Sequence, residues 1–512
     1  MAGVPHSGTP PTRGDKHASK IPKRASYEQS ALDSVPAGLY VAGEWRPASG
    51  GGTLAVEDPS TGEPLADVAD ATPQDALAAL DAAVAAQASW AATPPRERGE
   101  VLRRAYELLL ARIDELALVM TLEMGKPLGE SRAELTYAAE FLRWFSEEAV
   151  RVHGRYMTNT TGAGRILTMR QPVGPCVFVT PWNFPAAMGT RKIAPAIAAG
   201  CTMVVKPAQQ TPLSMLALAG VLEQAGLPGG VLNVITAHHS GAVIEPLLRD
   251  SRTRKLSFTG STEVGRTLIE QSAHQILRVS MELGGNAPFL VFEDADLDAA
   301  VEGALTAKLR NVGEACTAAN RFYVHESLAE EFSKRMAARM AKLEVGRGTE
   351  PGVDVGPLID ERQRGIVQEL VQDAVDHGAR LLTGGEPLPR SSHPGYFYAP
   401  TVLAGVTSGA RVLREEIFGP VAPIATFSTE EEAVSAANAT EYGLVAYLYT
   451  RELNRMFRVA EAIEAGMVGV NQGIVSNPAA PFGGVKQSGF GREGGFEGIG
   501  EYLETKYVAL AL

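Results

Sequence analysis

Two residues of this chain, an acid and a thiol in two separate turns, could act as a base and a nucleophile. Glu282 lies in the glycine-flanked stretch Met-Glu-Leu-Gly-Gly-Asn-Ala-Pro at 281–288, after an apolar run. Cys316 closes Gly-Glu-Ala-Cys at 313–316, after a run of helical character at 299–310. A carboxylate can serve as a general base and a thiol as a nucleophile. Small neighbours leave the Cys316 sulfur approachable, although a thiol in such a turn is by itself more often unreactive.

Two further polar residues follow apolar runs that resemble strands. Asn183 lies in Thr-Pro-Trp-Asn-Phe-Pro at 180–185, where its amide could donate to a developing oxyanion. Taken alone, a loop asparagine that makes a turn is the more frequent interpretation. Lys206 precedes a proline at the end of the next apolar run and could bind a ribose or a phosphate. A solvated lysine is the commoner case.

Two glycine-containing stretches also suggest ligand contacts. Phe-Thr-Gly-Ser-Thr-Glu-Val-Gly at 258–265 joins a predicted strand to a predicted helix, where glycines allow close approach to a pyrophosphate. It is neither a GxGxxG nor a P-loop motif, and Ser261 could equally be an N-cap. Glu-Glu-Ile-Phe-Gly-Pro at 415–420 pairs two acids with an aromatic residue, or is an ordinary turn with solvated acids. Cys176 and Cys201 lie in apolar contexts typical of inert core thiols.

The elements that must position these residues form two alternating sets. Short apolar strands are predicted at 176–179, 202–205, 231–235, 255–258 and 277–281, with helices between them. A second set of strands is predicted at 289–292, 322–324, 380–382, 422–427, 445–449 and 467–470. This alternation predicts an α/β protein with two doubly wound parallel sheets, which bind ligands beyond the carboxyl ends of their strands. Helices at 72–124, interrupted at Pro94 and Pro95, and at 133–153 precede the first set.

Composition limits the classes of function. The chain has 512 residues, a formal net charge of -12, and is 45% hydrophobic and 21% charged. These values are typical of a soluble globular protein and argue against nucleic-acid or anionic-membrane partners. The three cysteines form no CxxC and no zinc-type spacing, so we expect no metal and no disulfide. There is no apolar run of about 18 residues and no signal-peptide core, so we expect a cytoplasmic protein.

The motifs acquire specificity as an ordered set. TPWNFP, KPA, FTGSTEVG, MELGGNAP, GEAC, EEIFGP and PFGGVKQSGFGREG follow one another along the chain. In this order they resemble the NAD(P)-dependent aldehyde dehydrogenase superfamily, from about residue 38 to the C-terminus. Within it, the stretches 188–192, 309–311, 471–476 and 501–507 are most similar to succinate-semialdehyde dehydrogenases.

The resemblance implies a mechanism. Cys316 would attack an aldehyde as a thiolate, and the Asn183 amide with the Cys316 backbone N–H would hold the oxyanion. Hydride transfer to the nicotinamide would leave a thioester, which water activated by Glu282 would hydrolyse. The expected reaction is oxidation of succinate semialdehyde, or a close ω-carboxylated aldehyde, to the acid. The alternatives are glutarate semialdehyde or an aromatic aldehyde. A structural protein that reused the scaffold would be expected to lack one of the three groups.

The resemblance also assigns binding residues. For the cofactor, NAD or NADP, they are Trp182, Lys206, Gln209, Gly260, Ser261, Gly265, Glu416 and Phe418. Lys206 would contact the adenosine ribose, Ser261 the pyrophosphate and Glu416 the nicotinamide ribose. For a distal carboxylate they are Arg191, Arg310 and Ser476. A guanidinium suits a carboxylate because it can donate two parallel hydrogen bonds, but either arginine could instead form a structural ion pair.

Two departures from the family pattern have consequences. Gln209 stands where the family often has a glutamate that binds ribose hydroxyls. A carboxylate there would repel a 2′-phosphate and an amide does not, so we expect NADP to be tolerated. Ala318 stands where many succinate-semialdehyde enzymes carry a second cysteine, so we expect no disulfide switch between neighbouring cysteines.

The domain boundaries expected from this reading are as follows. Residues 1–36 would be a disordered tail. Residues 37–155 and 174–285 would form the dinucleotide-binding domain, and 286–480 the catalytic domain. Residues 156–173 and 481–512 would form a small β oligomerisation element. We expect a homo-oligomer, a dimer or a tetramer, and hypothesise that the apolar stretches 165–169 and 503–512 pair across subunits, because an uncovered edge strand is a liability.

Overall fold

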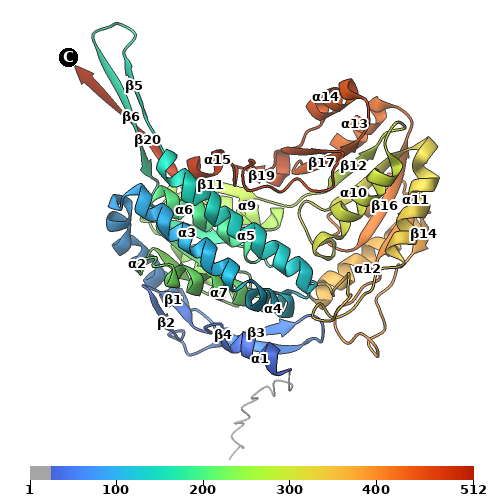
Figure 1. Ribbon diagram of the computed structural model, residues 1–512, viewed down its shortest axis with the longest axis horizontal. Coiled ribbons are helices and arrows are strands. Elements are labelled where there is room, and N and C mark those ends of the chain that lie inside the picture. The colour runs from blue at the N-terminus through green and yellow to red at the C-terminus, as the bar shows by residue number, and fades with distance from the viewer. Residues whose placement is uncertain (1–24, 512) are drawn as a thin grey trace, which may run out of the picture.

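The computed structural model describes residues 25–511, which form two lobes and a projecting arm (Figure 1). The expected disordered tail lies mostly outside the described residues, and for residues 26–33 the expectation is wrong. This segment is the helix α1 (Ser26–Asp33), in which Leu32 is buried. Glu28 is 1% exposed and pairs with Arg347 at 3.2 Å. The buried leucine therefore holds the segment against the first lobe, and the ion pair joins it to a loop of the second lobe.

The first lobe is built on a sheet of strand order β19-β11-β10-β7-β8-β9-β1-β2. Its central strands are parallel: β7 (Cys176–Val179), β8 (Met203–Lys206), β9 (Leu232–Val234), β10 (Lys255–Thr259) and β11 (Arg278–Glu282). The chain runs from β7 to β8 and β9 and then returns to β10 and β11 on the other side of β7. The order thus reverses between β7 and β10, and such a switch point opens a crevice at the carboxyl ends of the strands.

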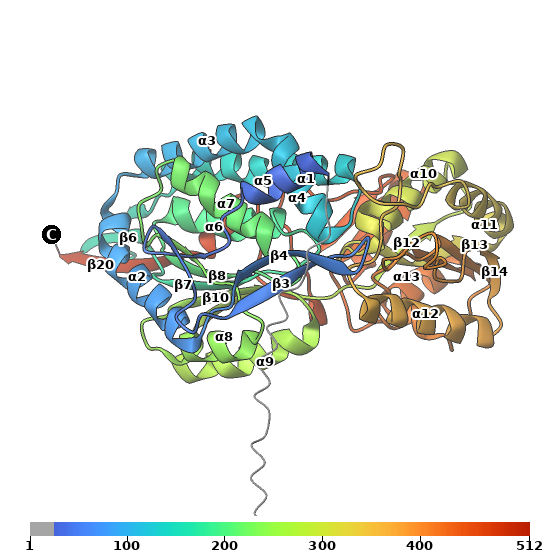
Figure 2. The ribbon, with the colours of Figure 1, turned by 90° about the horizontal axis from the view of Figure 1, so that it is seen from below.

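Helices cover both faces of this sheet, because successive residues of a strand point to opposite sides. Phe178 packs into the core beneath α6 and α7, and Val177 into the core beneath α8 and α9 (Figure 2). The bounds are α6 (Ala187–Ala199), α7 (Pro212–Gln224), α8 (Ser240–Arg249) and α9 (Thr262–Ser272). Three antiparallel edge strands complete the sheet: β1 (Leu39–Val41), β2 (Glu44–Arg46) and β19 (Gly489–Phe490).

The N-terminal part of this lobe is a hairpin followed by four helices. The hairpin pairs β3 (Thr53–Asp58) with β4 (Glu63–Ala69). The helices are α2 (Pro73–Ala92), α3 (Pro95–Ala111), α4 (Ile113–Met124) and α5 (Leu128–Glu148). Thr72 and Asp75 form a capping box at the start of α2. The predicted interruption at Pro94 and Pro95 is confirmed, and a second break falls at Arg112. Helix α5 packs on α3, α4 and α6 and so reaches the site.

The second lobe contains a sheet of order β14-β15-β16-β13-β12-β17-β18 in which every neighbouring pair is parallel except β14–β15. Its strands are β12 (Ala287–Val291), β13 (Ala319–His325), β14 (Arg380–Thr383), β15 (Thr401–Ala404), β16 (Val421–Phe427), β17 (Val445–Tyr449) and β18 (Met467–Val470). Its helices are α10 (Leu297–Leu309), α11 (Glu326–Met340), α12 (Glu361–Asp376), α13 (Glu430–Asn438) and α14 (Leu453–Ala462). The predicted α/β class with two parallel-rich sheets is confirmed, and β15 is a strand that the sequence analysis missed.

The arm is a three-stranded antiparallel sheet of order β20-β6-β5, formed by β5 (Arg155–Thr158), β6 (Gly164–Pro172) and β20 (Leu503–Ala511). The two apolar stretches expected to pair across subunits pair with each other within one chain, from Leu503 with Pro172 to Ala511 with Gly164. The expected boundary at 481 is too early. Residues 489–490 belong to the first sheet as β19, and the short helix α15 (Glu497–Gly500) precedes β20.

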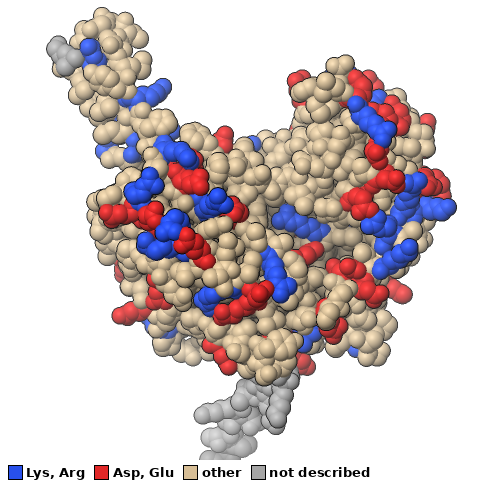
Figure 3. All heavy atoms as spheres, in the orientation of Figure 1, with Lys and Arg blue, Asp and Glu red and all other residues tan. Residues whose placement is uncertain are grey.

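Charges of both signs are interspersed over the face of the molecule seen in Figure 3. None of the helices within residues 25–511 is both long and apolar enough to cross a membrane.

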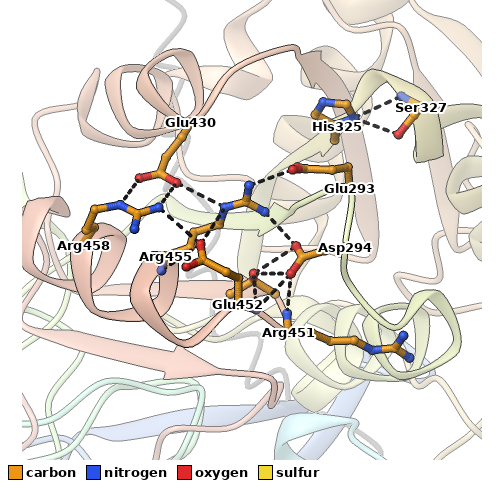
Figure 4. A network of polar contacts seen from close by, with 10 residues as sticks. Glu293, Asp294, His325, Ser327, Glu430, Arg451, Glu452, Arg455 and Arg458 are labelled. Atoms are coloured by element: carbon orange, nitrogen blue, oxygen red, sulfur yellow. Dashed lines mark hydrogen bonds and ion pairs between the residues drawn. The ribbon is translucent and has the colours of Figure 1, made fainter.

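On the outer side of the second lobe, Arg455 joins three segments in one network (Figure 4). Its guanidinium lies 2.7 Å from Glu293, 2.8 Å from Asp294 and 3.1 Å from Glu430. It also stacks on Phe292 at 4.7 Å, so it ties α13 and α14 to the end of β12.

We expect Arg455→Ala to lower the free energy of unfolding by about 1–2 kcal/mol, because it removes the cation shared by three carboxylates and a stacking contact. Urea-induced unfolding at pH 7 would measure the loss. The matched control is Arg458→Ala, whose side chain is 54% exposed against 16% for Arg455. Its loss should be clearly smaller, and equal losses for the two variants would contradict a central role for Arg455.

Candidate active site

The carboxyl ends of β7, β10 and β11 border a cavity of about 250 Å³. Eight of the predicted site residues line it: Trp182, Asn183, Gly260, Ser261, Glu282, Cys316, Glu416 and Phe418. The rest of its wall is Pro181, Met188, Thr259, Leu283, Gly284, Gln363 and Ile366. The topological switch point and the turn after α10 thus bring together a thiol, a carboxyl group and an amide that are distant in sequence.

The turn that carries Cys316 has an unusual backbone. Asn311, Val312 and Gly313 have φ angles of 56°, 60° and 80°. A β-branched residue such as Val312 rarely adopts this left-handed conformation, so the surroundings must enforce it. The Asn311 N–H donates to Glu130 on α5 at 2.6 Å. The Asn311 side-chain amide donates to the backbone oxygens of Asn183, at 3.0 Å, and Glu314, at 2.8 Å.

Asn183 is fixed by the same turn. Its Nδ2 donates to the Glu314 backbone oxygen at 3.0 Å, and its own backbone oxygen accepts from the buried Lys126 at 2.9 Å. A side-chain amide has two N–H donors, so the second remains available to the cavity beside Cys316. This placement agrees with the predicted role of an oxyanion donor.

Glu282 has the environment of a protonated acid. It is 2% exposed, and both of its carboxyl oxygens are buried without a hydrogen-bond partner among residues 25–511. Burial raises the pKa of Glu282 well above its usual value, and the neighbouring Glu493 raises it further. A neutral carboxyl group becomes a base only when it loses its proton to a group that enters the site.

Cys316 is likewise neutral at rest. Burial raises the pKa of its thiol to about 12, although the positive charges of Arg191 and Arg310 act in the opposite direction. The thiolate is therefore not present in quantity at pH 7. It must form as substrate or cofactor changes the surroundings of the sulfur.

Glu493 is a site residue that the sequence analysis missed, although it lies inside the quoted motif PFGGVKQSGFGREG. It is 3% exposed and accepts from Arg191 at 2.8 Å and from Lys192. Burial alone would raise the pKa of Glu493, but the two cations hold it at about 2. Arg191, predicted to bind a carboxylate of the substrate, is 1% exposed and lies in this ion pair, above the ring of Phe482 at 3.8 Å.

Arg310, the second arginine predicted to bind a carboxylate, has a different setting. Its guanidinium donates to the Ser476 hydroxyl at 3.2 Å and lies 4.9 Å above the ring of Phe184. No carboxylate of the described residues forms an ion pair with it. Arg310 and Ser476 thus lie together as predicted, on a side of Cys316 outside the 250 Å³ cavity.

The opposite wall of the cavity suits a nicotinamide nucleotide. Trp182 and Phe418 meet edge to face at 5.5 Å and form an apolar corner of the wall. Glu416 accepts from the Gly285 N–H at 3.1 Å, and burial raises its pKa to about 7. Thr259 presents a buried hydroxyl without a partner, an open hydrogen-bonding position in the wall.

The first turn of α9 forms the adjoining edge of this wall. Ser261 caps the helix by accepting from the Val264 N–H at 3.4 Å, as the alternative interpretation foresaw, and it still faces the cavity. A Cβ on Gly260 would lie 2.4 Å from the Phe258 ring. One on Gly265 would lie 2.5 Å from Leu283. A side chain at either position would therefore have to displace Phe258 or Leu283, and the N-terminus of α9 suits a pyrophosphate.

Lys206 and Gln209 lie farther along the crevice, after β8, and do not line the cavity. Lys206 is 3% exposed and donates to Ser240 at 2.5 Å. Burial lowers the pKa of Lys206 to about 8, although Asp70 acts to raise it. Gln209 is half-buried. Both follow the carboxyl end of the strand next to β7, where a nucleotide bound at the switch point would extend.

The fold and the site define an α/β protein whose cavity, at the switch point of a parallel sheet, brings together a thiol, a carboxyl group and an amide. A model of the aldehyde dehydrogenase family matches residues 45–508. The chain belongs to the aldehyde dehydrogenase family, and the resemblance inferred from the ordered motifs is confirmed.

Relatives in this family cover nearly the whole chain. The succinate-semialdehyde dehydrogenase of Paenarthrobacter nicotinovorans is 61% identical over 87% of this chain and 99% of its own length. The succinate-semialdehyde dehydrogenase [NADP(+)] of Escherichia coli K12 and a glutarate-semialdehyde dehydrogenase of Pseudomonas putida are each 49% identical, over 92% of this chain and 97% of their own. The crystal structure of succinate-semialdehyde dehydrogenase from Burkholderia pseudomallei has a TM-score of 0.93 at 48% identity, covering 95% of this chain and 100% of that one. Betaine aldehyde dehydrogenase from Staphylococcus aureus, in complex with NAD+, has a TM-score of 0.92 at 31% identity, covering 95% and 98%.

The raised pKa of Cys316 gives a direct test. Iodoacetamide reacts with thiolates, so alkylation of Cys316 in the cofactor-free enzyme should accelerate about tenfold per pH unit from pH 7 to 9.5 without levelling off. Mass spectrometry of the tryptic peptide would follow the reaction, with Cys316→Ser as the unlabelled control. Cys176 and Cys201 are fully buried and should stay unmodified. A plateau below pH 9 would show that the thiol titrates in its ordinary range.

Proposed function

We propose that this protein oxidises succinate semialdehyde, or a close ω-carboxylated aldehyde, to the diacid with NAD or NADP. The observation that supports the proposal most strongly is the setting of Arg310. Its half-buried guanidinium has no carboxylate partner among the described residues, lies beside Ser476, and adds to the positive field at Cys316. An aldehyde with a terminal carboxylate supplies the missing anion, and the names of the relatives specify such aldehydes.

The residues divide the chemistry among them. The Cys316 thiolate forms a bond to the aldehyde carbon, and the negative charge moves to the aldehyde oxygen. The Asn183 amide and the Cys316 backbone N–H donate to that oxygen. As the C=O bond re-forms from that oxygen, the carbon would lose its hydrogen as hydride and become a thioester of Cys316; a bound nicotinamide would supply the hydride acceptor. Glu282, once deprotonated, takes a proton from water as the water oxygen attacks the thioester carbon, and the Cys316 sulfur leaves as thiolate.

Arg191 is less available than Arg310 to bind the substrate carboxylate. It is paired with Glu493, yet its Nη1 is buried without a hydrogen-bond partner, so one donor remains for a substrate carboxylate. For the cofactor, Trp182 and Phe418 flank the nicotinamide, Glu416 binds its ribose, and the α9 turn binds the pyrophosphate. Lys206 and Gln209 face the adenosine ribose.

Glutarate semialdehyde is the second candidate substrate. Two relatives named glutarate-semialdehyde dehydrogenase are 49% identical to this chain, as is the succinate-semialdehyde dehydrogenase of Escherichia coli. Glutarate semialdehyde places the same carboxylate one methylene farther from the aldehyde.

We also propose a homo-oligomer assembled through the arm, because the arm exposes large apolar residues that a monomer would leave in water: Tyr156 66%, Met157 46%, Tyr507 61% and Leu510 39%. The three free thiols fit the reducing cytosol as its location.

Arg310→Ala should separate substrates by charge. We expect kcat/KM for succinate semialdehyde to fall by about 100-fold or more, because a charge-assisted hydrogen-bond pair is lost, and kcat/KM for butanal to change by less than about threefold. Initial rates of nicotinamide reduction with both aldehydes and with glutarate semialdehyde would show this. If wild-type enzyme oxidises butanal as well as succinate semialdehyde, the carboxylate proposal fails.

Gln209→Glu should change the cofactor preference. The wild-type enzyme is expected to use NADP with a kcat/KM within about 100-fold of that for NAD, because the amide does not repel the 2′-phosphate. The variant should lose about tenfold or more with NADP and little with NAD. Gln210→Glu, on the neighbouring half-buried residue, controls for added charge alone. A wild-type preference for NAD above about 100-fold would make this interpretation of Gln209 wrong.

A further inference from the structure

Tyr137 on α5 has a hydroxyl group that contributes no hydrogen bond to the fold of the described residues. The hydroxyl oxygen of Tyr137 is buried and has no hydrogen-bond partner among the described residues. Its ring packs edge to face on Phe141 at 4.8 Å, a contact that needs no hydroxyl. A buried hydroxyl without a partner costs free energy, so a tyrosine retained only for packing would be better replaced by phenylalanine.

The hydroxyl lies within the cluster already described. The guanidinium carbon of Arg310 is 5.8 Å from the Tyr137 ring centroid, and the same guanidinium donates to the Ser476 hydroxyl at 3.2 Å. Arg191, from α6, is close enough for its charge to act on the phenol. Three elements, α5, α6 and the turn after α10, thus converge on one point.

The donors at this point lack acceptors. Within the described part of the chain, the Tyr137 hydroxyl and Arg191 Nη1 are buried without hydrogen-bond partners, and the one acceptor of Arg310 is the Ser476 hydroxyl. Glu493, an acid whose charge acts on the phenol, is already held by Arg191 and Lys192. Converging donors without an acceptor match a small anion with several lone pairs, such as a carboxylate.

We propose that Tyr137 is a specificity-determining residue whose phenol donates a hydrogen bond to the terminal carboxylate of the substrate, beside Arg310 and Ser476. This inference rests on the proposed function, since it names a further residue of the same substrate site. Burial raises the pKa of Tyr137, so at neutral pH the phenol is a donor and adds no negative charge. Donors from three directions would fix the carboxylate and thereby the distance from it to the aldehyde carbon at Cys316.

Tyr137→Phe removes the hydroxyl and keeps the ring. We expect kcat/KM for succinate semialdehyde to fall about tenfold or more, mainly through KM, while kcat/KM for butanal stays within about twofold. Calorimetric titration of the cofactor-free enzyme with succinate should show a Kd raised by a similar factor. The matched control is Tyr106→Phe on α3, where Arg143 also lies 5.8 Å from the ring, and neither quantity should change.

The results distinguish a failure of the role given to Tyr137 from a failure of the proposed function. If wild-type enzyme does not prefer succinate semialdehyde to butanal, the proposed function fails before Tyr137 is considered. If wild-type enzyme shows the preference and Tyr137→Phe retains it, the role of the hydroxyl is wrong. An equal loss with both aldehydes would show that Tyr137 acts only on the shape of the site and would also overturn the inference. Unfolding midpoints of both variants would establish that each is folded.

Discussion

The left-handed turn at residues 311–313 is the constraint on which the site depends. Three successive residues, one of them a valine, adopt a conformation that costs free energy at each non-glycine position. Hydrogen bonds from Asn311 to Glu130, Asn183 and Glu314 enforce it. Because the same Asn311 amide contacts Asn183 and Glu314, the residue two before Cys316, one side chain fixes the positions of the sulfur and of the Asn183 amide.

Burial keeps Glu282 and Cys316 uncharged in the absence of ligands. Glu282 and Cys316 both have raised pKa values, so the cavity holds a neutral acid and a neutral thiol at rest. The cations nearby, Arg191 and Arg310, oppose the effect of burial on the thiol. Charges interact more strongly at a buried site than in water, so an anionic substrate beside Arg310 and a cationic nicotinamide beside Glu416 would change the pKa of the Cys316 thiol.

The sequence predicted the parts of the site that lie in short motifs, since eight of the named residues line one cavity. It did not predict how buried polar groups far apart in the chain pair with one another. Glu130 and Asn311, or Arg191 and Glu493, meet only because α5, α6 and the C-terminal segment pack together, and no periodicity encodes this. The same applies to Tyr137, whose significance lies in the absence of a partner. Helix α1 was missed because the polar composition around it resembles a tail, while its few apolar residues suffice to dock it.

The C-terminal segment connects the arm to the catalytic groups. Phe482 and Glu493 exchange two backbone hydrogen bonds of 2.8 Å, which fix a loop whose Phe482 ring supports Arg191 and whose Glu493 carboxylate neutralises it. Ten residues farther on, β20 enters the arm at Leu503 and pairs with β6. A displacement of β20 would therefore pull on the segment that holds Glu493, and through it on the charge that faces Cys316. An arm buried between subunits would brace this segment, so assembly and the electrostatics of the nucleophile depend on the same stretch of chain.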